Sequence, residues 1–322
     1  MEYGRIPGID KPVSRLVQGN TMIHTDDLDG AFALLDAVFE VGCTTFDTAH
    51  VYGGGSCERA LGEWLAHRGL REQVVVVDKG AHHNADRRCV TPYDITAHLH
   101  DSLARLKTDY IDLYLLHRDD PTVPVEPIVD ILNEHHQAGR IRAFGGSNWS
   151  HARLEAANAY ASANRLVPFA VTSPHFSLAQ QVEEPWENCV SITGPQQLSA
   201  QTWYIDNQMP VFAWSSLAGG FLSGRYDRAA IEALPRDCSE IYARCYRCKE
   251  NLERLDRIHN LARAKGATIP QLALAFVLTH PMNVYPLVGC QSAEEFRINA
   301  AALDIHLSPE EMDWLDLKRE TV

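Results

Sequence analysis

The chain has 322 residues, 45% of them hydrophobic, so it can bury a substantial core and has a normal length for one α/β barrel. Its formal net charge is −13 and it has no long basic run, which argues against nucleic acid or an anionic membrane as a partner. No apolar run approaches the length of a membrane span, and the N-terminus lacks the apolar core of a signal peptide. We therefore expect a cytoplasmic protein.

The eight cysteines are scattered along the chain, a pattern that in a reducing compartment predicts buried thiols rather than disulfides. Three of them, Cys238, Cys245 and Cys248, lie close together in sequence. A zinc ion would need a fourth ligand and usually a second paired motif, and neither is nearby. We predict no metal site and assign no role to this cluster.

Short apolar runs alternate with amphipathic runs at a regular spacing, which is typical of repeated βα units. We expect strands over residues 14–18, 43–47, 73–78, 111–116, 141–145, 169–173, 210–214 and 283–288. We expect helices over residues 29–41, 56–67, 92–106, 125–138, 150–163, 251–265 and 270–279, and a terminal helix that a capping box over residues 308–311 starts.

The sixth and seventh strands are joined by a longer, irregular connection, and residues 226–250 form a polar excursion. Eight strands with helices between them predict a (β/α)8 TIM barrel with an additional C-terminal helix. Neither a low-complexity linker nor an internal repeat beyond the βα unit is present, so we expect residues 1–322 to form a single domain.

Polar residues follow three consecutive expected strands. Asp47 ends the second and Tyr52 follows it, Lys79 ends the third, and His117 ends the fourth. In such a barrel the chemistry lies at the C-terminal ends of the strands. Individually, Asp47 and Lys79 could be a structural ion pair and His117 a satisfied histidine. Together at matched strand ends, the four residues favour catalysis.

The chemistry of these four side chains suits proton donation. A tyrosine hydroxyl, with an ordinary pKa of about 10, is a poor acid at neutral pH, but the ammonium of Lys79 would stabilise the phenolate. Asp47 would keep Lys79 charged and oriented. A neutral His117 can donate a hydrogen bond to the oxygen of a bound carbonyl group.

Several segments closely resemble the signature segments of the aldo-keto reductases, and the resemblance runs essentially from end to end. They are FDTAHVYG over residues 46–53, ERALG over 58–62, Lys79, DYIDLYLLH over 109–117 and GSN over 146–148. The resemblance implies a barrel that binds a nicotinamide dinucleotide without a Rossmann domain and reversibly reduces an aldehyde or ketone. It makes Tyr52 the proton donor and gives Asp47, Lys79 and His117 the three supporting roles.

The same resemblance implies where the cofactor binds. Ser147 and Asn148 match the pair that holds the nicotinamide carboxamide, and Trp214 stands where an aromatic residue stacks under the ring. The loop over residues 215–224, with Ser215, Leu217 and Gly219, matches the segment that covers the pyrophosphate.

Two departures from the family pattern concern this cofactor. Ser173 replaces the usual glutamine at the carboxamide, which leaves His175 or a water as a substitute. In the segment for the adenosine end, with Gly289, Gln291, Glu295 and Asn299, a carboxylate at 295 would repel a 2′-phosphate, although Arg297 could restore its binding. The choice between NADP(H) and NAD(H) stays open.

Loops after the strands supply the candidate substrate contacts, which are Met22, His82, His83, Asp119, Trp149 and His175. Their polarity favours a small hydroxylated, sugar-like carbonyl substrate. The alternative is a regulatory or redox-sensing subunit that binds the cofactor with little turnover, a use that this barrel has in related proteins. The third reading, a catalytically silent barrel, is disfavoured by the four residues. A homo-oligomer also stays open.

Overall fold

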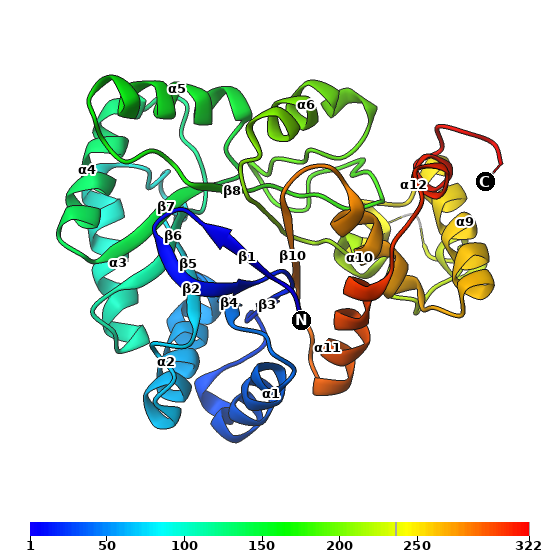
Figure 1. The fold of residues 1–322 in the computed structure, drawn as a ribbon, viewed down its shortest axis with the longest axis horizontal. Helices are drawn as coiled ribbons and strands as arrows, with labels where there is room; N and C mark the ends of the chain where they lie inside the picture. Colours follow the sequence, from blue (N-terminus) through cyan, green and yellow to red (C-terminus); the bar gives the residue numbers. More distant parts are fainter. Residues whose placement is uncertain (236, 322) are drawn as a thin grey trace.

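Parallel strands close into an eight-stranded barrel in the computed structural model, which describes residues 1–235 and 237–321 (Figure 1). The order around the barrel is β10-β3-β4-β5-β6-β7-β8-β9. The strands are β3 (Val17–Gly19), β4 (Thr45–Asp47), β5 (Val75–Gly80), β6 (Ile111–Leu116), β7 (Ile141–Ser147), β8 (Val171–Ser173), β9 (Val211–Ala213) and β10 (Val284–Val288). The predicted TIM barrel is confirmed.

Helices surround the barrel (Figure 1). The predicted ones are α1 (Leu28–Glu40), α2 (Ser56–Arg68), α3 (Pro92–Leu106), α4 (Val125–Gln137), α5 (His151–Ala163), α9 (Lys249–Lys265), α10 (Ile269–Thr279) and α12 (Pro309–Leu315). The capping box that starts α12 is present, with Ser308 and Glu311 exchanging hydrogen bonds. The terminal helix is joined to α9, where Arg257 Nη1 donates to the carbonyl oxygen of Trp314 at 2.7 Å.

Four further helices were not predicted: α6 (Leu198–Asn207), α7 (Arg228–Glu232), α8 (Ile241–Arg244) and α11 (Ala293–Ala300). The helix α6 lies in the connection that was expected to be irregular. It buries only Ala200 and Tyr204, so its sequence lacks the apolar stripe that reveals a packed helix. In the described chain, no helix is both long enough and apolar enough to cross a membrane.

A hairpin of β1 (Tyr3–Ile6) and β2 (Ile9–Ser14) lies across one mouth of the barrel (Figure 1). Its apolar side chains, including Ile6, Ile9 and Val13, join the cluster inside the barrel. The expected strand over 14–18 is therefore divided. Ser14 ends the hairpin, where its hydroxyl donates to the carbonyl oxygen of Leu16 at 2.9 Å, and the barrel strand starts at Val17.

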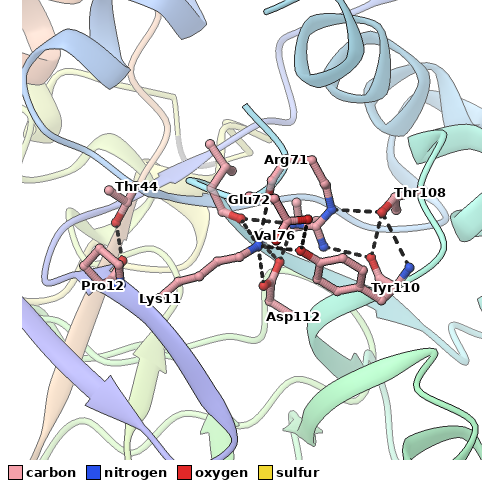
Figure 2. Close-up of polar contacts among 10 residues, drawn as sticks. Lys11, Pro12, Thr44, Arg71, Glu72, Val76, Thr108, Tyr110 and Asp112 are labelled. Atoms are coloured by element: carbon pink, nitrogen blue, oxygen red, sulfur yellow. Dashed lines mark hydrogen bonds and ion pairs between the residues drawn. The ribbon is translucent and has the colours of Figure 1, made fainter. Parts of the chain in front are cut away.

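A polar cluster fastens this hairpin beside β6. Figure 2 shows Lys11 and Arg71 converging on Asp112, which each contacts at 2.8 Å. Lys11 Nζ also donates to the hydroxyl of Tyr110 at 3.0 Å, and Asp112 accepts a hydrogen bond from the backbone N–H of Val76 at 3.0 Å. The hairpin thus closes the N-terminal end of the barrel, which leaves the C-terminal ends of the strands for a binding site.

Candidate active site

A cavity of about 1070 Å³ lies at the C-terminal ends of the barrel strands. Residues from most of the strand ends contribute to its wall. They include Gly19, Asp47, Lys79, His117, Ser147, Trp214 and Val288. The parallel direction of the strands explains this gathering, because every strand delivers its last residues to the same end of the barrel.

Asp47, Lys79 and Tyr52 form a connected group in this cavity. The buried Lys79 Nζ lies 2.6 Å from Asp47 Oδ1 and 2.5 Å from Oδ2, and it also donates to the carbonyl oxygen of Thr48 at 3.1 Å. The hydroxyl of Tyr52 lies 3.4 Å from the same nitrogen. The strands β4 and β5 are neighbours in the sheet, which brings the acid and the lysine together.

A turn of three glycines places Tyr52 over the cavity. Gly53, Gly54 and Gly55 have φ of 54°, 61° and 90°, a left-handed conformation that glycine adopts without strain. At Gly55, an added Cβ would lie 2.7 Å from the guanidinium carbon of Arg105. The backbone conformation therefore favours glycine at all three positions, and an added side chain would also be crowded at Gly55.

The charges in this group keep the lysine protonated and the tyrosine neutral. Burial is the largest single influence and opposes the charge of Lys79, but Asp47, Tyr52 and Asp78 together outweigh burial and raise the pKa of Lys79 above its ordinary value. Burial also raises the pKa of Tyr52, and Lys79 only partly offsets that rise. Lys79 thus makes the hydroxyl more acidic than burial alone would leave it, but not more acidic than an ordinary tyrosine. The hydroxyl of Tyr52 is therefore neutral at neutral pH.

His117 completes the predicted four. Its ring faces Tyr52 edge-on, with the ring centroids 5.6 Å apart. Burial, followed by the nearby charges of Lys79 and Arg118, lowers the pKa of His117 well below its ordinary value. The imidazole is therefore neutral and can donate one N–H to a ligand. Its Nδ1 is buried and has no hydrogen-bond partner among residues 1–235 and 237–321.

Ser147 and Asn148 line the cavity at the end of β7. Asn148 Oδ1 accepts a hydrogen bond from the N–H of Val190 at 3.0 Å, and its Nδ2 lies 3.2 Å from Ser147 Oγ. The Ser147 hydroxyl donates in turn to the carbonyl oxygen of Ser173 at 2.9 Å. This chain of hydrogen bonds fixes both side chains at the cavity wall before any ligand binds.

Trp214 forms part of the wall between two aromatic neighbours, with ring centroids 5.1 Å from His175 and 6.1 Å from Trp186. Its Nε1 is buried without a partner in the described chain. The loop that follows brings Ser215, Leu217 and Gly219 to the cavity.

The predicted adenosine segment also lines the cavity, at Gly289, Gln291, Glu295 and Asn299. Glu295 Oε2 accepts from the N–H of Gln291 at 2.8 Å, and Glu295 Oε1 lies 3.2 Å from Arg225 Nη2. This ion pair joins the segment to the glycine-rich loop. Arg297 lies outside the wall and is instead 3.9 Å from Glu294, so the cation at this end is Arg225, which the sequence interpretation missed.

Met22, His82 and His83, three of the candidate substrate contacts, line the cavity, but four other candidate site residues do not. Ser173 is buried in β8, and Asp119 is engaged by Arg153, whose Nε lies 3.1 Å away. These two side chains belong to the packing around the barrel rather than to the wall.

The other two are His175 and Trp149, which are also buried. His175 lies behind Trp214, where its Nδ1 is 2.8 Å from Ser191 Oγ and its Nε2 is 3.1 Å from the hydroxyl of Tyr246. Trp149 donates its Nε1–H to the carbonyl oxygen of Arg118 at 3.2 Å. Both support the wall from outside.

Part of the wall was not predicted. Trp186, Glu187 and Cys189 come from the long connection after β8, and Arg118 directly follows His117. The connection has no periodicity from which its packing could be inferred. Arg118 could have been found from its position beside a strand-end histidine. No group of three or more histidine, cysteine or acidic side chains among the described residues is arranged to hold a metal ion.

Comparison with known proteins gives a consistent result. The model of the aldo/keto reductase family matches residues 17–320. The uncharacterized oxidoreductase YrpG of Bacillus subtilis is 29% identical, with 98% of this chain and 95% of that protein covered. A probable voltage-gated potassium channel subunit beta of Oryza sativa is also 29% identical, over 98% of this chain and 96% of that protein.

Among solved structures, an aldo-keto reductase from Klebsiella pneumoniae in complex with NADPH is 28% identical, with a TM-score of 0.73 over 100% of this chain and 96% of that one. The family match spans nearly the whole barrel and every residue of the site described above. The chain therefore belongs to the aldo/keto reductase family and is an NAD(P)-dependent oxidoreductase.

Proposed function

We propose that this chain reduces an aldehyde or ketone in the cavity described above, with Tyr52 as the proton donor. The observation that carries the proposal is the contact network of Lys79. Its Nζ is held by both carboxylate oxygens of Asp47 and lies 3.4 Å from the hydroxyl of Tyr52, in a cavity that also contains the neutral His117.

The cavity walls fit a nicotinamide dinucleotide. Its volume of about 1070 Å³ slightly exceeds the roughly 300–1,000 Å³ of most small-molecule sites, so a dinucleotide and a small substrate can share it. The indole of Trp214 offers an aromatic face to a flat ring. An added Cβ on Gly220, where φ is +99°, would meet nothing within 4 Å, so the backbone there is open to a ligand.

When bound, the nicotinamide would supply the hydride. Ser147 and Asn148 would hold its carboxamide, and Trp214 would pack against one face of its ring. His117 would donate a hydrogen bond to the carbonyl oxygen of the substrate. Tyr52 would donate the proton, and Lys79 would stabilise the phenolate that remains.

A hydroxylated, sugar-like carbonyl compound is the substrate that we propose from the polar wall. His82 and His83 both line the cavity. Burial lowers the pKa of His82 to about 4, so its ring is neutral at neutral pH. Its Nδ1 donates to the carbonyl oxygen of His83 at 2.8 Å, which leaves Nε2 as an acceptor for a hydroxyl group of the substrate.

The relative from Oryza sativa favours a second candidate function, because it is named as a channel subunit and is 29% identical over 98% of this chain. Under this alternative the chain would bind a nicotinamide cofactor as a regulatory or redox-sensing subunit with little turnover. Carbonyl turnover separates the two functions.

Tyr52→Phe tests the proposed function. General acid catalysis contributes about 10²–10⁴-fold, so we expect turnover of aldehydes with NADPH or NADH to fall by that factor. Quenching of tryptophan fluorescence by the cofactor should remain, because the phenol does not hold the nicotinamide. The matched control is Tyr93→Phe, at a tyrosine that is 78% exposed, and it should change neither quantity. Wild-type turnover in Tyr52→Phe would refute the assignment.

We further propose that residues 1–322 form one domain around the barrel, since one continuous core joins the barrel strands to the surrounding helices. All eight cysteines are free thiols, which supports a reducing compartment such as the cytoplasm. A homo-oligomer remains a proposal to be tested by the mass in solution.

A further inference from the structure

Arg118 is a buried cation without an acidic partner among the residues that the structure describes. Three arginines are buried in the described chain, with exposures of 4% for Arg254, 6% for Arg118 and 8% for Arg257. Arg254 lies 3.3 Å from Asp316 and Arg257 lies 3.0 Å from Glu253. Among residues 1–235 and 237–321, no carboxylate forms an ion pair with Arg118.

The acids closest to Arg118 in sequence are already engaged. Asp119 is paired with Arg153 at 3.1 Å, and Asp120 with Arg88 at 3.2 Å. Among the acids on the cavity wall, Asp47 is held by Lys79. These three carboxylates are therefore not free to neutralise Arg118.

The remaining acid on this part of the wall is Glu187, whose side chain is exposed. Only its backbone contacts the arginine, through a hydrogen bond of 3.2 Å from Arg118 Nε to the carbonyl oxygen. A solvated carboxylate at the rim is strongly screened and offsets a buried charge weakly. Glu187 therefore neutralises the charge of Arg118 only weakly.

Backbone contacts hold the guanidinium in place and leave one end of it free. Arg118 Nη1 donates to the carbonyl oxygen of His117 at 2.9 Å, and Nε donates to Glu187. Nη2, with two N–H donors, makes no hydrogen bond to a described residue. Arg118 lines the cavity, so these donors are available to a ligand there.

Arg118 belongs to the part of the cavity where the carbonyl group would react. It directly follows His117, and its charge is one of the causes that act on the pKa values of Tyr52, His117 and His82. The cation at the glycine-rich loop is a different residue, Arg225. Arg118 is thus placed for the substrate and not for the adenosine end of a dinucleotide.

We propose that Arg118 binds an anionic group, a carboxylate or a phosphate, on the carbonyl substrate. The substrate class is then an oxo acid or a phosphorylated aldehyde or ketone. The guanidinium plane suits such oxyanions, and a bound anion would offset the loss of solvation of a buried cation. The proposal rests on the proposed function, since the anion is taken to be part of the reduced molecule.

Two matched substrate pairs test the proposal. Succinic semialdehyde is compared with butanal for the carboxylate, and glyceraldehyde 3-phosphate with glyceraldehyde for the phosphate. We expect the wild-type enzyme to prefer the anionic member of at least one pair in kcat/KM. In Arg118→Met the ratio of anionic to neutral kcat/KM should fall about 10- to 100-fold, as expected for the loss of a charge-assisted hydrogen bond.

Controls separate this role from a structural one. A variant that only disturbed His117 would lower kcat/KM for both members of a pair alike. Arg118→Lys keeps the charge and should recover part of the preference. Arg88 is the matched control, because it lies outside the cavity wall and contacts Asn188 in the connection after β8. Arg88→Met should leave the ratio of anionic to neutral kcat/KM unchanged. Absence of a preference in the wild type, or an unchanged ratio in Arg118→Met, would overturn the proposal.

A binding measurement keeps the test independent of turnover. Acetate and inorganic phosphate are titrated against tryptophan fluorescence at constant ionic strength, with chloride as the balancing salt. Saturable binding of one anion in the wild type and its loss in Arg118→Met would support the anion site. This result would count even if none of the four aldehydes were reduced. In that case the proposed function would fail and the anion site would stand. Equal binding by both proteins, or none in the wild type, would exclude the site. Thermal melting confirms that each variant is folded.

Discussion

Removal of the lysine from the buried Asp47–Lys79 pair gives the most quantitative prediction. In Lys79→Met, the Asp47 carboxylate loses contacts of 2.5 and 2.6 Å and has no other hydrogen bond to a described residue. Breaking a buried ion pair by removing one partner typically costs about 3–5 kcal/mol. We expect the free energy of unfolding at neutral pH to fall by about that amount, together with the loss of turnover.

The double variant Asp47→Leu, Lys79→Met separates stability from catalysis. Replacing both charges with apolar groups is often neutral or stabilising, so the double variant should regain most of the stability that Lys79→Met loses, while it stays inactive. Lys107→Met is the matched control. Its partner Glu63 lies 2.6 Å away, but the side chains are 48% and 40% exposed, so a change below about 1 kcal/mol is expected.

The loss of stability in Lys79→Met should also depend on pH. Burial raises the pKa of Asp47, and the variant lacks the lysine charge that opposes this rise. A carboxyl group whose pKa is higher in the folded than in the unfolded protein destabilises the fold at pH values above its unfolded pKa of about 4. Below that pH the group has no such effect. Urea denaturation, followed by circular dichroism, should show the largest difference from wild type near pH 7 and a smaller one near pH 4. A Lys79→Met variant as stable as wild type at pH 7, or a double variant less stable than the single one, would refute the reasoning.

Two further predictions concern other acids. Glu295→Gln removes the carboxylate and releases Arg225, so affinity for NADPH should rise relative to NADH by about 1 kcal/mol, roughly fivefold, in fluorescence titrations; an unchanged ratio would contradict a role in cofactor choice. Burial, with Glu58 nearby, raises the pKa of Asp78 well above its ordinary value, so this carboxyl opposes folding above about pH 4. Asp78→Asn should therefore raise Tm at pH 7 and have little effect near pH 4, and a lower Tm at pH 7 would be evidence against it.

The barrel and the four central residues could be predicted because their signals are local. Each barrel strand is a short apolar run, and a parallel sheet brings the residues that follow such runs to one edge. Asp47, Lys79 and His117 therefore follow from strand ends alone. The placement of Tyr52 depends in addition on the turn after β4, which three consecutive glycines indicate in the sequence.

The features that were missed depend on contacts between distant segments. The sequence of residues 3–14 alone does not indicate that this hairpin packs on the barrel. Its apolar side chains enter the barrel because the N-terminal mouth of the barrel is open to them. The direction of a side chain at the end of a strand is equally non-local. Ser173 stands where the family usually has a glutamine, and His175 was considered as its substitute, yet Ser173 lies within β8 and His175 lies behind Trp214. That Arg118 forms no ion pair with a described carboxylate could be seen only from the positions of the acids around it.

The balance of forces on Tyr52 also required the structure. From the sequence, a lysine beside a tyrosine indicates a more acidic hydroxyl. Burial of the Tyr52 hydroxyl affects its pKa more strongly than the charge of Lys79 does. The pKa of Tyr52 therefore lies above its ordinary value even with Lys79 at 3.4 Å. Under the proposed function, we expect Lys79 to act mainly on the phenolate that would form during the reaction, because its ammonium group attracts an anion more strongly than a neutral phenol.

A single turnover measured by stopped flow tests the central claim most directly. Enzyme saturated with NADPH is mixed with each of the four aldehydes, and the nicotinamide absorbance is followed in wild type and in Tyr52→Phe. The account predicts that the wild type oxidises one equivalent of bound cofactor per site and forms the alcohol, and that Tyr52→Phe binds the cofactor but oxidises it at least about 100-fold more slowly. Equal rates in the two proteins, or a wild type that binds NADPH and oxidises none with any aldehyde, would contradict it.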